Sequence, residues 1–140
     1  MRTILIVLSI IIGVHIAAAA VDTGKIFKET GTFSSKDGKE LYEENCKGCH
    51  MPEGKGVHTG VGMYPALAGN PNVAMPDYTA YVIMHGLRGM PSFEQDMTDE
   101  QIAAVANHVA ESFGNKSTGT IKADAVKGIR PGNGVVYIDY

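Results

Sequence analysis

The two cysteines of this 140-residue chain lie in one pentapeptide, Cys46-Lys47-Gly48-Cys49-His50. Two thiols separated by two residues can each add to one vinyl group of a haem, and a histidine directly after them can reach the iron from the same side. The pentapeptide therefore has the pattern of c-type haem attachment. Because it contains every cysteine of the chain, no structural disulfide remains to stabilise the fold.

Three other interpretations of the pentapeptide are a thioredoxin-like redox pair, half of a zinc site, and chance. A redox pair follows a strand in a βαβ pattern, whereas the residues before Cys46 are typical of a helix. A zinc site needs further thiolates, which the chain lacks. Haem attachment is the interpretation that agrees with the surrounding sequence.

The first twenty residues resemble an export signal. Arg2 is followed by an apolar run over residues 4–16 and by four alanines. Cleavage after Ala20, or one residue earlier, would leave a mature chain that starts near Val21. The alternative is an uncleaved anchor, although the apolar run is shorter than the roughly 20 residues that span a bilayer. No second apolar stretch of that kind follows, so we expect a periplasmic protein with no membrane span after cleavage.

Composition excludes one function class and indicates a weak core. The net charge is −3, and Lys and Arg form no run, so the chain lacks the electrostatic footprint of a nucleic-acid-binding protein. It has 17 Gly, four Phe, six Tyr and no Trp, and the aliphatic residues concentrate before position 21. A haem would supply the apolar surface that the side chains lack, so we expect the apoprotein to be poorly folded.

Three helices are predicted, separated by loops rich in Gly and Pro. Residues 37–45 contain mostly helix formers, and residues 77–85 are apolar nearly all round and stop before Gly86. The third helix starts with a capping box at residues 98–101, carries an apolar stripe over residues 102–113, and is expected to end at Gly114. Residues 51–75 are predicted to form an irregular loop. The tail after Asn115 could lie across the domain or act as a docking strand.

A haem with one histidine ligand leaves the sixth iron position to be assigned. Met90 is the preferred candidate because it lies between two predicted helices, with Gly89 before it and Pro91 after it. A thioether ligand closes the iron to small molecules and raises the reduction potential, which favours electron transfer. The alternatives are Met63 and Met75. Met51 is too close to His50 to reach the other haem face, Met84 is expected to fill the core, and His108 is expected to be solvated. The remaining methionine and histidines of the mature chain are Met97, His58 and His85.

These motifs together resemble a class I cytochrome c. The resemblance rests on Cys-x-x-Cys-His after a helix, on Tyr64-Pro65-Ala66-Leu67-Ala68-Gly69, and on Gly-Met-Pro before a last helix, and it covers residues 35–113. It implies an all-α fold, with three to four helices around one covalently bound haem c, attached through Cys46 and Cys49 and ligated by His50 and Met90. It further implies that the first and last helices cross at right angles, with Gly38 and Tyr42 against the apolar stripe of residues 102–113. It also implies that the Pro65 carbonyl accepts a hydrogen bond from the ligating imidazole of His50. His108 departs from the aromatic residue that many relatives carry there.

The predicted organisation is a signal peptide over residues 1–20, an N-terminal extension over 21–34, a cytochrome c domain over 35–114 and a C-terminal extension over 115–140. Candidate residues of the haem pocket, each of which also fits an ordinary core position or an exposed loop, are Tyr64, Pro65, Leu67, Arg88 and Phe93, with Tyr78 and Val82 as further wall candidates.

The resemblance implies a monomeric one-electron carrier rather than an enzyme. Its electron donors would be periplasmic dehydrogenases, quinoproteins or flavoproteins that oxidise alcohols, aldehydes or amines. Its acceptor would be a terminal oxidase of the respiratory chain or another cytochrome. Two alternatives stay open: a permanent cytochrome subunit of a dehydrogenase or oxidase complex, and a haem peroxidase or sensor.

Overall fold

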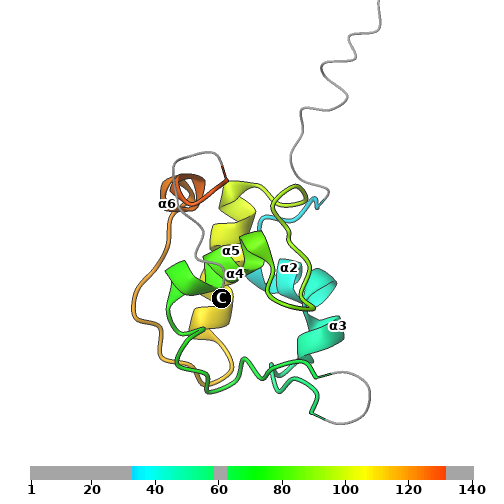
Figure 1. The fold of residues 1–140 in the computed structure, drawn as a ribbon. Helices are drawn as coiled ribbons and strands as arrows, with labels where there is room; N and C mark the ends of the chain where they lie inside the picture. The colour runs from blue at the N-terminus through cyan, green and yellow to red at the C-terminus, as the bar shows by residue number, and fades with distance from the viewer. Residues whose placement is uncertain (1–32, 59–62, 132–140) are drawn as a thin grey trace, which may run out of the picture.

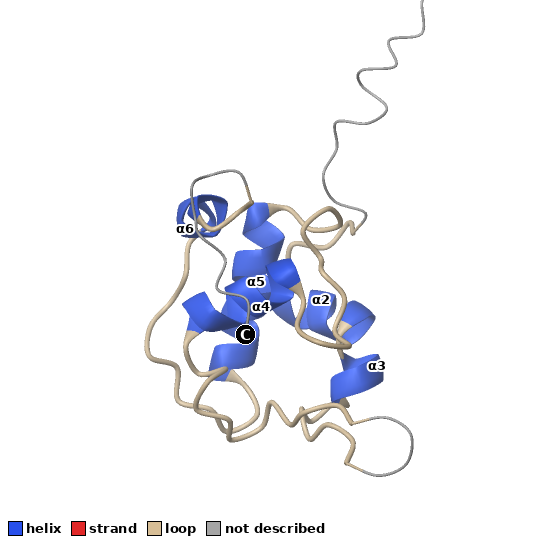
Figure 2. Ribbon diagram, in the orientation of Figure 1, coloured by secondary structure: helices blue, strands red, loops and turns tan. Residues whose placement is uncertain are grey.

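The computed structural model describes residues 33–58 and 63–131, which fold into five helices (Figures 1 and 2). In chain order these are α2 (Gly38–Asn45), α3 (Lys47–His50), α4 (Pro76–His85), α5 (Asp99–Glu111) and α6 (Ala123–Gly128). Within these residues the only β pairing consists of two isolated bridges, Val57 with Tyr64 and Leu87 with Met90. The prediction of an all-α fold is confirmed.

Helix α2 starts where its sequence predicts and is held closely against α5. The Asp37 side chain caps it by accepting hydrogen bonds from the amides of Lys39 and Glu40. A Cβ at Gly38 would collide with the carbonyl oxygen of Ala104, so only glycine lets the two helices approach this closely. Four residues later, the ring of Tyr42 also faces α5.

Helix α5 begins with the predicted capping box but ends earlier than predicted. Thr98 and Gln101 satisfy each other's backbone amides. The last helical residue is Glu111, and Phe113 and Gly114 both have positive φ, 59° and 77°. The expected end at Gly114 is therefore too late. Phe113 takes the left-handed position because its ring packs 5.0 Å from the ring of Tyr42.

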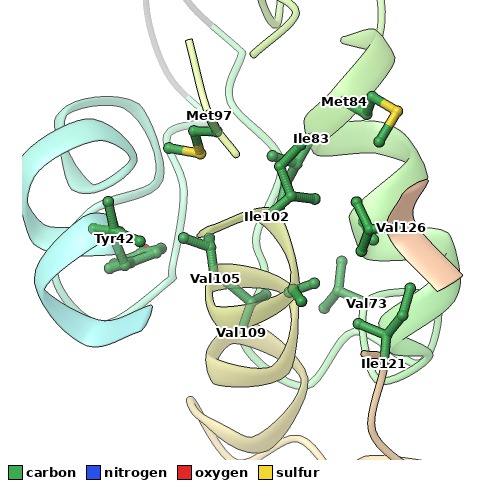
Figure 3. Packing of buried hydrophobic residues seen from close by; sticks show 14 residues of the cluster. Tyr42, Val73, Ile83, Met84, Met97, Ile102, Val105, Val109, Ile121 and Val126 are labelled. Atoms are coloured by element: carbon green, nitrogen blue, oxygen red, sulfur yellow. The ribbon is translucent and has the colours of Figure 1, made fainter. Parts of the chain in front are cut away.

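The core lies where α2, α4, α5 and α6 meet (Figure 3). Ile102, Val105 and Val109 form the central stripe of α5, and all three are buried. Ile83 and Met84 of α4 approach it from one side, so Met84 fills the core as expected. The remaining buried apolar residues come from α2, α4, α5 and α6 and from the connecting segments, and include Leu41, Val73, Ala80, Met97, Ile121 and Val126.

The chain after α5 lies across the domain at least as far as Pro131. It runs back along the molecule and places α6 near the start of α5 (Figure 1). Ile121 and Val126 are buried in the common core. The first of the two alternatives for this segment is thus correct for residues 115–131, whereas residues 132–140 are outside the described part.

Along residues 33–58 and 63–131, no helix combines the length and the hydropathy that crossing a bilayer requires. The predicted signal segment, residues 1–20, is outside the described residues.

Candidate haem-binding site

The cysteine pentapeptide forms the junction of α2 and α3. Cys46 ends α2, and its amide donates to the carbonyl of Tyr42 at 2.9 Å. Neither cysteine forms a disulfide; Cys46 is half-buried and Cys49 is exposed. Burial, assisted by the nearby Cys49, raises the pKa of Cys46 to about 12. A redox-active Cys-x-x-Cys pair needs a lowered thiol pKa, so this environment does not suit the thioredoxin-like alternative.

His50 presents one ring nitrogen to the backbone. Its Nδ1 lies 3.0 Å from the carbonyl oxygen of Pro65, the partner that the resemblance implies. A carbonyl can only accept, so Nδ1 carries the proton and Nε2 keeps the lone pair that a metal requires. Such a second partner fixes the tautomer and ring orientation of a ligating histidine.

The loop after His50 folds back so that Pro65 can reach the imidazole. The carbonyl of Gly54 accepts hydrogen bonds from the amides of Leu67 (2.7 Å) and Ala68 (2.9 Å). Val57 and Tyr64 exchange backbone hydrogen bonds at 2.9 Å. The predicted irregular loop therefore has a defined backbone on both sides of Pro65, and Leu67 packs at the edge of the core.

Met90 lies in a tight turn between α4 and α5. Leu87 and Met90 pair across this turn, and the amide of Phe93 donates to the carbonyl of Ile83 at the end of α4, at 3.1 Å. Met90 and Phe93 are half-buried and pack against the core, and Arg88 is exposed in the turn with φ 55°. The sulfur-bearing residue is thus fixed by its own turn and by α4.

The alternative ligands are in different surroundings. Met63 is 80% exposed and Met75 is 40% exposed. Among the histidines, His58 is exposed, and the ring of His85 packs 4.4 Å from the ring of Tyr81. Met75 is the N-cap of α4 and His85 its last residue, whereas His58 and Met63 are next to the paired residues Val57 and Tyr64.

The surroundings of His50 and Met90 fit a haem. Large apolar side chains stay partly exposed on the loop that carries Pro65, the partner of His50, and on the turn that carries Met90: Tyr64 is 40% exposed and Leu87 is 48% exposed. A flat apolar macrocycle would cover such surface, which is otherwise costly to expose. Two free thiols and an imidazole with Nε2 available are the groups that c-type haem attachment uses, and a thioether is one of the sixth ligands found in cytochromes. In that arrangement Cys46 and Cys49 would hold the macrocycle, and His50 and Met90 its iron.

Sequence reasoning misjudged His108. It is half-buried rather than solvated, with its ring 5.7 Å from the ring of Tyr42 and 5.9 Å from that of Phe113. Its ring therefore packs between the ring of Tyr42 in α2 and that of Phe113 after α5. Its spacing of four residues from Ala104, which faces Gly38, was the signal that could have placed it at this contact.

Comparisons with known proteins agree with this geometry. The family model described as cytochrome C oxidase, cbb3-type, subunit III matches residues 34–109. The cytochrome subunit of fructose dehydrogenase from Gluconobacter japonicus is 39% identical over 111 residues, which cover 69% of this chain and 22% of that protein. The cytochrome c subunit of the quinone alcohol dehydrogenase from Gluconobacter oxydans is 33% identical over 106 residues, with 66% and 22% covered. The chain thus spans about a fifth of these two relatives.

A third relative has a length closer to that of this chain. Cytochrome c-552 from Thermus thermophilus is 34% identical over 112 residues, which cover 68% of this chain and 76% of that protein. The matched family, these relatives and the all-α fold together show that the chain belongs to the class I cytochromes c, a family of electron-transfer proteins.

Proposed function

We propose that the protein is a periplasmic one-electron carrier that binds a single haem c. Cys46 and Cys49 attach the macrocycle, and His50 and Met90 ligate the iron. The observation that carries the proposal is the 3.0 Å contact of His50 Nδ1 with the Pro65 carbonyl, which leaves Nε2 for the metal. The bound haem supplies one-electron chemistry at its iron, and the polypeptide positions and tunes it.

Ligation by Met90 is what separates a carrier from a haem enzyme. A six-coordinate iron changes its oxidation state with little rearrangement, whereas an open position permits peroxide or oxygen chemistry. The paired turn and the Phe93 to Ile83 hydrogen bond hold Met90 in place in the folded chain. This supports the carrier over the peroxidase or sensor.

The first experiment is the visible spectrum of the holoprotein in both redox states. The wild type is expected to show the weak long-wavelength band that iron–thioether ligation gives in cytochromes, and Met90→Ala to lose it. Met63→Ala and Met75→Ala are matched controls that should retain it. A high-spin wild type that binds small ligands would overturn the carrier proposal, and loss of the band in a control variant would reassign the ligand.

The proposed electron donor is a quinoprotein or flavoprotein dehydrogenase that oxidises an alcohol, an aldehyde or an amine. Two of the relatives are cytochrome subunits of dehydrogenases, which supports this class of donor. The acceptor would be a terminal oxidase or another cytochrome, and docking would be brief and small in area, as in redox encounters generally. Tyr64, Leu67, Arg88 and Phe93 remain the proposed pocket residues around the haem.

A stable subunit and a free monomeric carrier differ in how they behave during purification. Deleting residues 115–140 would remove the buried Ile121 and Val126 and so would damage the domain itself. A chain that ends at Pro131 keeps every contact described here and is the appropriate truncation. Size-exclusion chromatography of the extracted protein, in both lengths, should show a monomer; a wild type that elutes with a dehydrogenase would indicate a subunit.

Export is proposed from the sequence of residues 1–20. Mass spectrometry of the periplasmic protein should find a chain that begins at Val21 and carries the added mass of one haem. A chain that still begins at Met1 in the membrane fraction would indicate the uncleaved anchor instead.

A further inference from the structure

Asn115 connects α5 to the loop that carries Pro65. Its Nδ2 donates to the carbonyl of Val109 in α5 at 2.9 Å and to the carbonyl of Leu67 at 3.0 Å. Its Oδ1 accepts from the amide of Asn70 at 3.1 Å. The side chain is half-buried, and all three of its partners are backbone groups. A single amide therefore fastens the turn over residues 67–70 to the end of the long helix.

The turn in question sets the direction of the Pro65 carbonyl. The pyrrolidine ring fixes φ of Pro65, so its carbonyl can swing only with the peptide plane that joins it to Ala66. The side chain of Asn70 donates to the carbonyl of Ala66 at 3.1 Å. Asn115 holds the amide of Asn70, and Asn70 holds the Ala66 carbonyl, which belongs to the peptide plane directly after that of the Pro65 carbonyl. The Gly54 carbonyl holds the same turn from the other side.

We propose that Asn115 is a positioning residue for His50. By fixing the turn after Pro65, it keeps the Pro65 carbonyl against Nδ1 and so maintains the electron density at the opposite ring nitrogen. A firm hydrogen bond at Nδ1 makes a ligating imidazole more basic, which stabilises ferric over ferrous iron. Loosening it should therefore raise the reduction potential. The inference rests on the proposed ligation of a haem iron by His50.

Asn107 provides a matched control for this role. Its Nδ2 donates to the carbonyl of Ile121 at 2.9 Å, and its Oδ1 accepts from the Ile121 amide at 2.9 Å. Like Asn115 it is a half-buried asparagine whose side chain binds backbone groups. It fastens the approach to α6, however, and not the Pro65 loop. A merely structural role predicts the same behaviour for both asparagines.

The test uses full-length holoprotein with Asn115→Ala, Asn70→Ala and Asn107→Ala. The midpoint potential is measured by redox titration, and the solvent exchange of the His50 Nδ1 proton by NMR of the reduced protein. Asn115→Ala and Asn70→Ala should raise the potential and speed this exchange several-fold. Asn107→Ala should lower the unfolding midpoint and leave both readouts unchanged.

The outcomes separate this inference from the proposed function. An unchanged potential and exchange rate in Asn115→Ala, or an equal shift in Asn107→Ala, would overturn the positioning role and leave the carrier proposal standing. If Asn115→Ala does not accumulate as holoprotein, Asn70→Ala decides in the same way. A wild type whose spectrum lacks histidine-ligated low-spin iron would overturn the proposed function itself.

Discussion

Leu87 and Met90 exchange both of their backbone hydrogen bonds. The Leu87 amide donates to the Met90 carbonyl at 3.2 Å, and the Met90 amide donates to the Leu87 carbonyl at 3.0 Å. The two residues between them, Arg88 and Gly89, form the tip of a tight turn. The candidate sulfur ligand is consequently positioned by backbone geometry, and that geometry can be changed without altering Met90 itself.

Gly86→Ala should dislodge Met90. Gly86 has φ 74°, and a Cβ there would lie 2.5 Å from the Met90 carbonyl oxygen and 2.9 Å from the Ser92 amide. Left-handed strain costs roughly 1–2 kcal/mol, and the backbone clash adds to it. We expect a loss of about 2 kcal/mol or more in the free energy of unfolding, together with loss of the iron–thioether band.

Gly89→Ala is the control for that change. It lies in the same turn, its φ is outside the left-handed region, and a Cβ would meet no protein atom within 4 Å. Denaturant unfolding of both variants, followed by visible absorbance, makes the comparison. Equal losses in the two variants would mean that the conformation of Gly86 is not what holds Met90.

Arg88→Gly should stabilise the same turn. Arg88 has φ 55°, a conformation that costs energy for any residue with a Cβ and little for glycine. The backbone strain energy that glycine removes exceeds the cost of the extra conformational entropy that glycine loses on folding. We therefore expect a gain of roughly 0.5 kcal/mol in the free energy of unfolding. Arg88→Ala removes the same charge but keeps the Cβ, so it should show no such gain. A gain in both variants would assign the effect to the charge.

The sequence predicted the parts of this fold that depend on local chemistry. The capping box at Thr98 and the stop at Gly86 are short-range signals, and the helices begin or end there in the structure. The end of α5 was misplaced because the left-handed conformation of Phe113 depends on Tyr42, which is distant in the sequence.

In the candidate site too, sequence patterns identify residues that are close together in the chain and miss contacts between distant ones. Cys46, Cys49 and His50 stand out because their spacing is itself the chemical requirement. The role of Asn115 was not visible, because its partners Leu67 and Asn70 are more than 40 residues away in the chain. A polar residue in a polar stretch carries no periodic or motif signal, so only the folded backbone identifies it.

Arg130→Gln should loosen the C-terminal segment from α5. The guanidinium donates to Asp99 Oδ1 (2.5 Å), the Glu94 carbonyl (2.6 Å) and the Met97 carbonyl (2.8 Å). The Arg130 side chain is only 18% exposed, so these charge-assisted bonds are little screened. We expect a loss of about 2 kcal/mol in the free energy of unfolding.

Arg130→Lys tests the geometry of that contact. Lysine keeps the charge, but its ammonium group lacks the planar guanidinium geometry that donates to three acceptors at once. It should therefore recover only part of the lost free energy of unfolding. Lys122→Gln removes a positive charge from an exposed residue of the same tail and should change little. Chemical denaturation of the three holoproteins gives the ranking. Full recovery of stability in Arg130→Lys would show that the positive charge alone, and not the planar guanidinium geometry, holds the C-terminal segment.

His108 should make the protein less stable in mild acid. Burial lowers its pKa below the ordinary value of 6.5, and this outweighs the attraction of Asp37, Glu43 and Glu111; the nearby Lys39 lowers it further. The unfolded chain therefore binds this proton at a higher pH than the folded chain does. The stabilisation is complete above about pH 6.5 and is lost as the pH falls toward the folded pKa.

His108→Phe removes the titrating ring while phenylalanine can keep the ring contacts with Tyr42 and Phe113; it also removes the 3.3 Å contact of His108 Nδ1 with Ser112 Oγ. The stability of the rest of the protein also varies with pH, so the informative quantity is the difference between wild type and variant. Thermal unfolding of both holoproteins between about pH 7.5 and 5 should show a larger loss in the wild type. Parallel pH profiles would mean that the His108 ring titrates alike in the folded and unfolded chains, and that its packing between α2 and α5 does not depend on its being neutral.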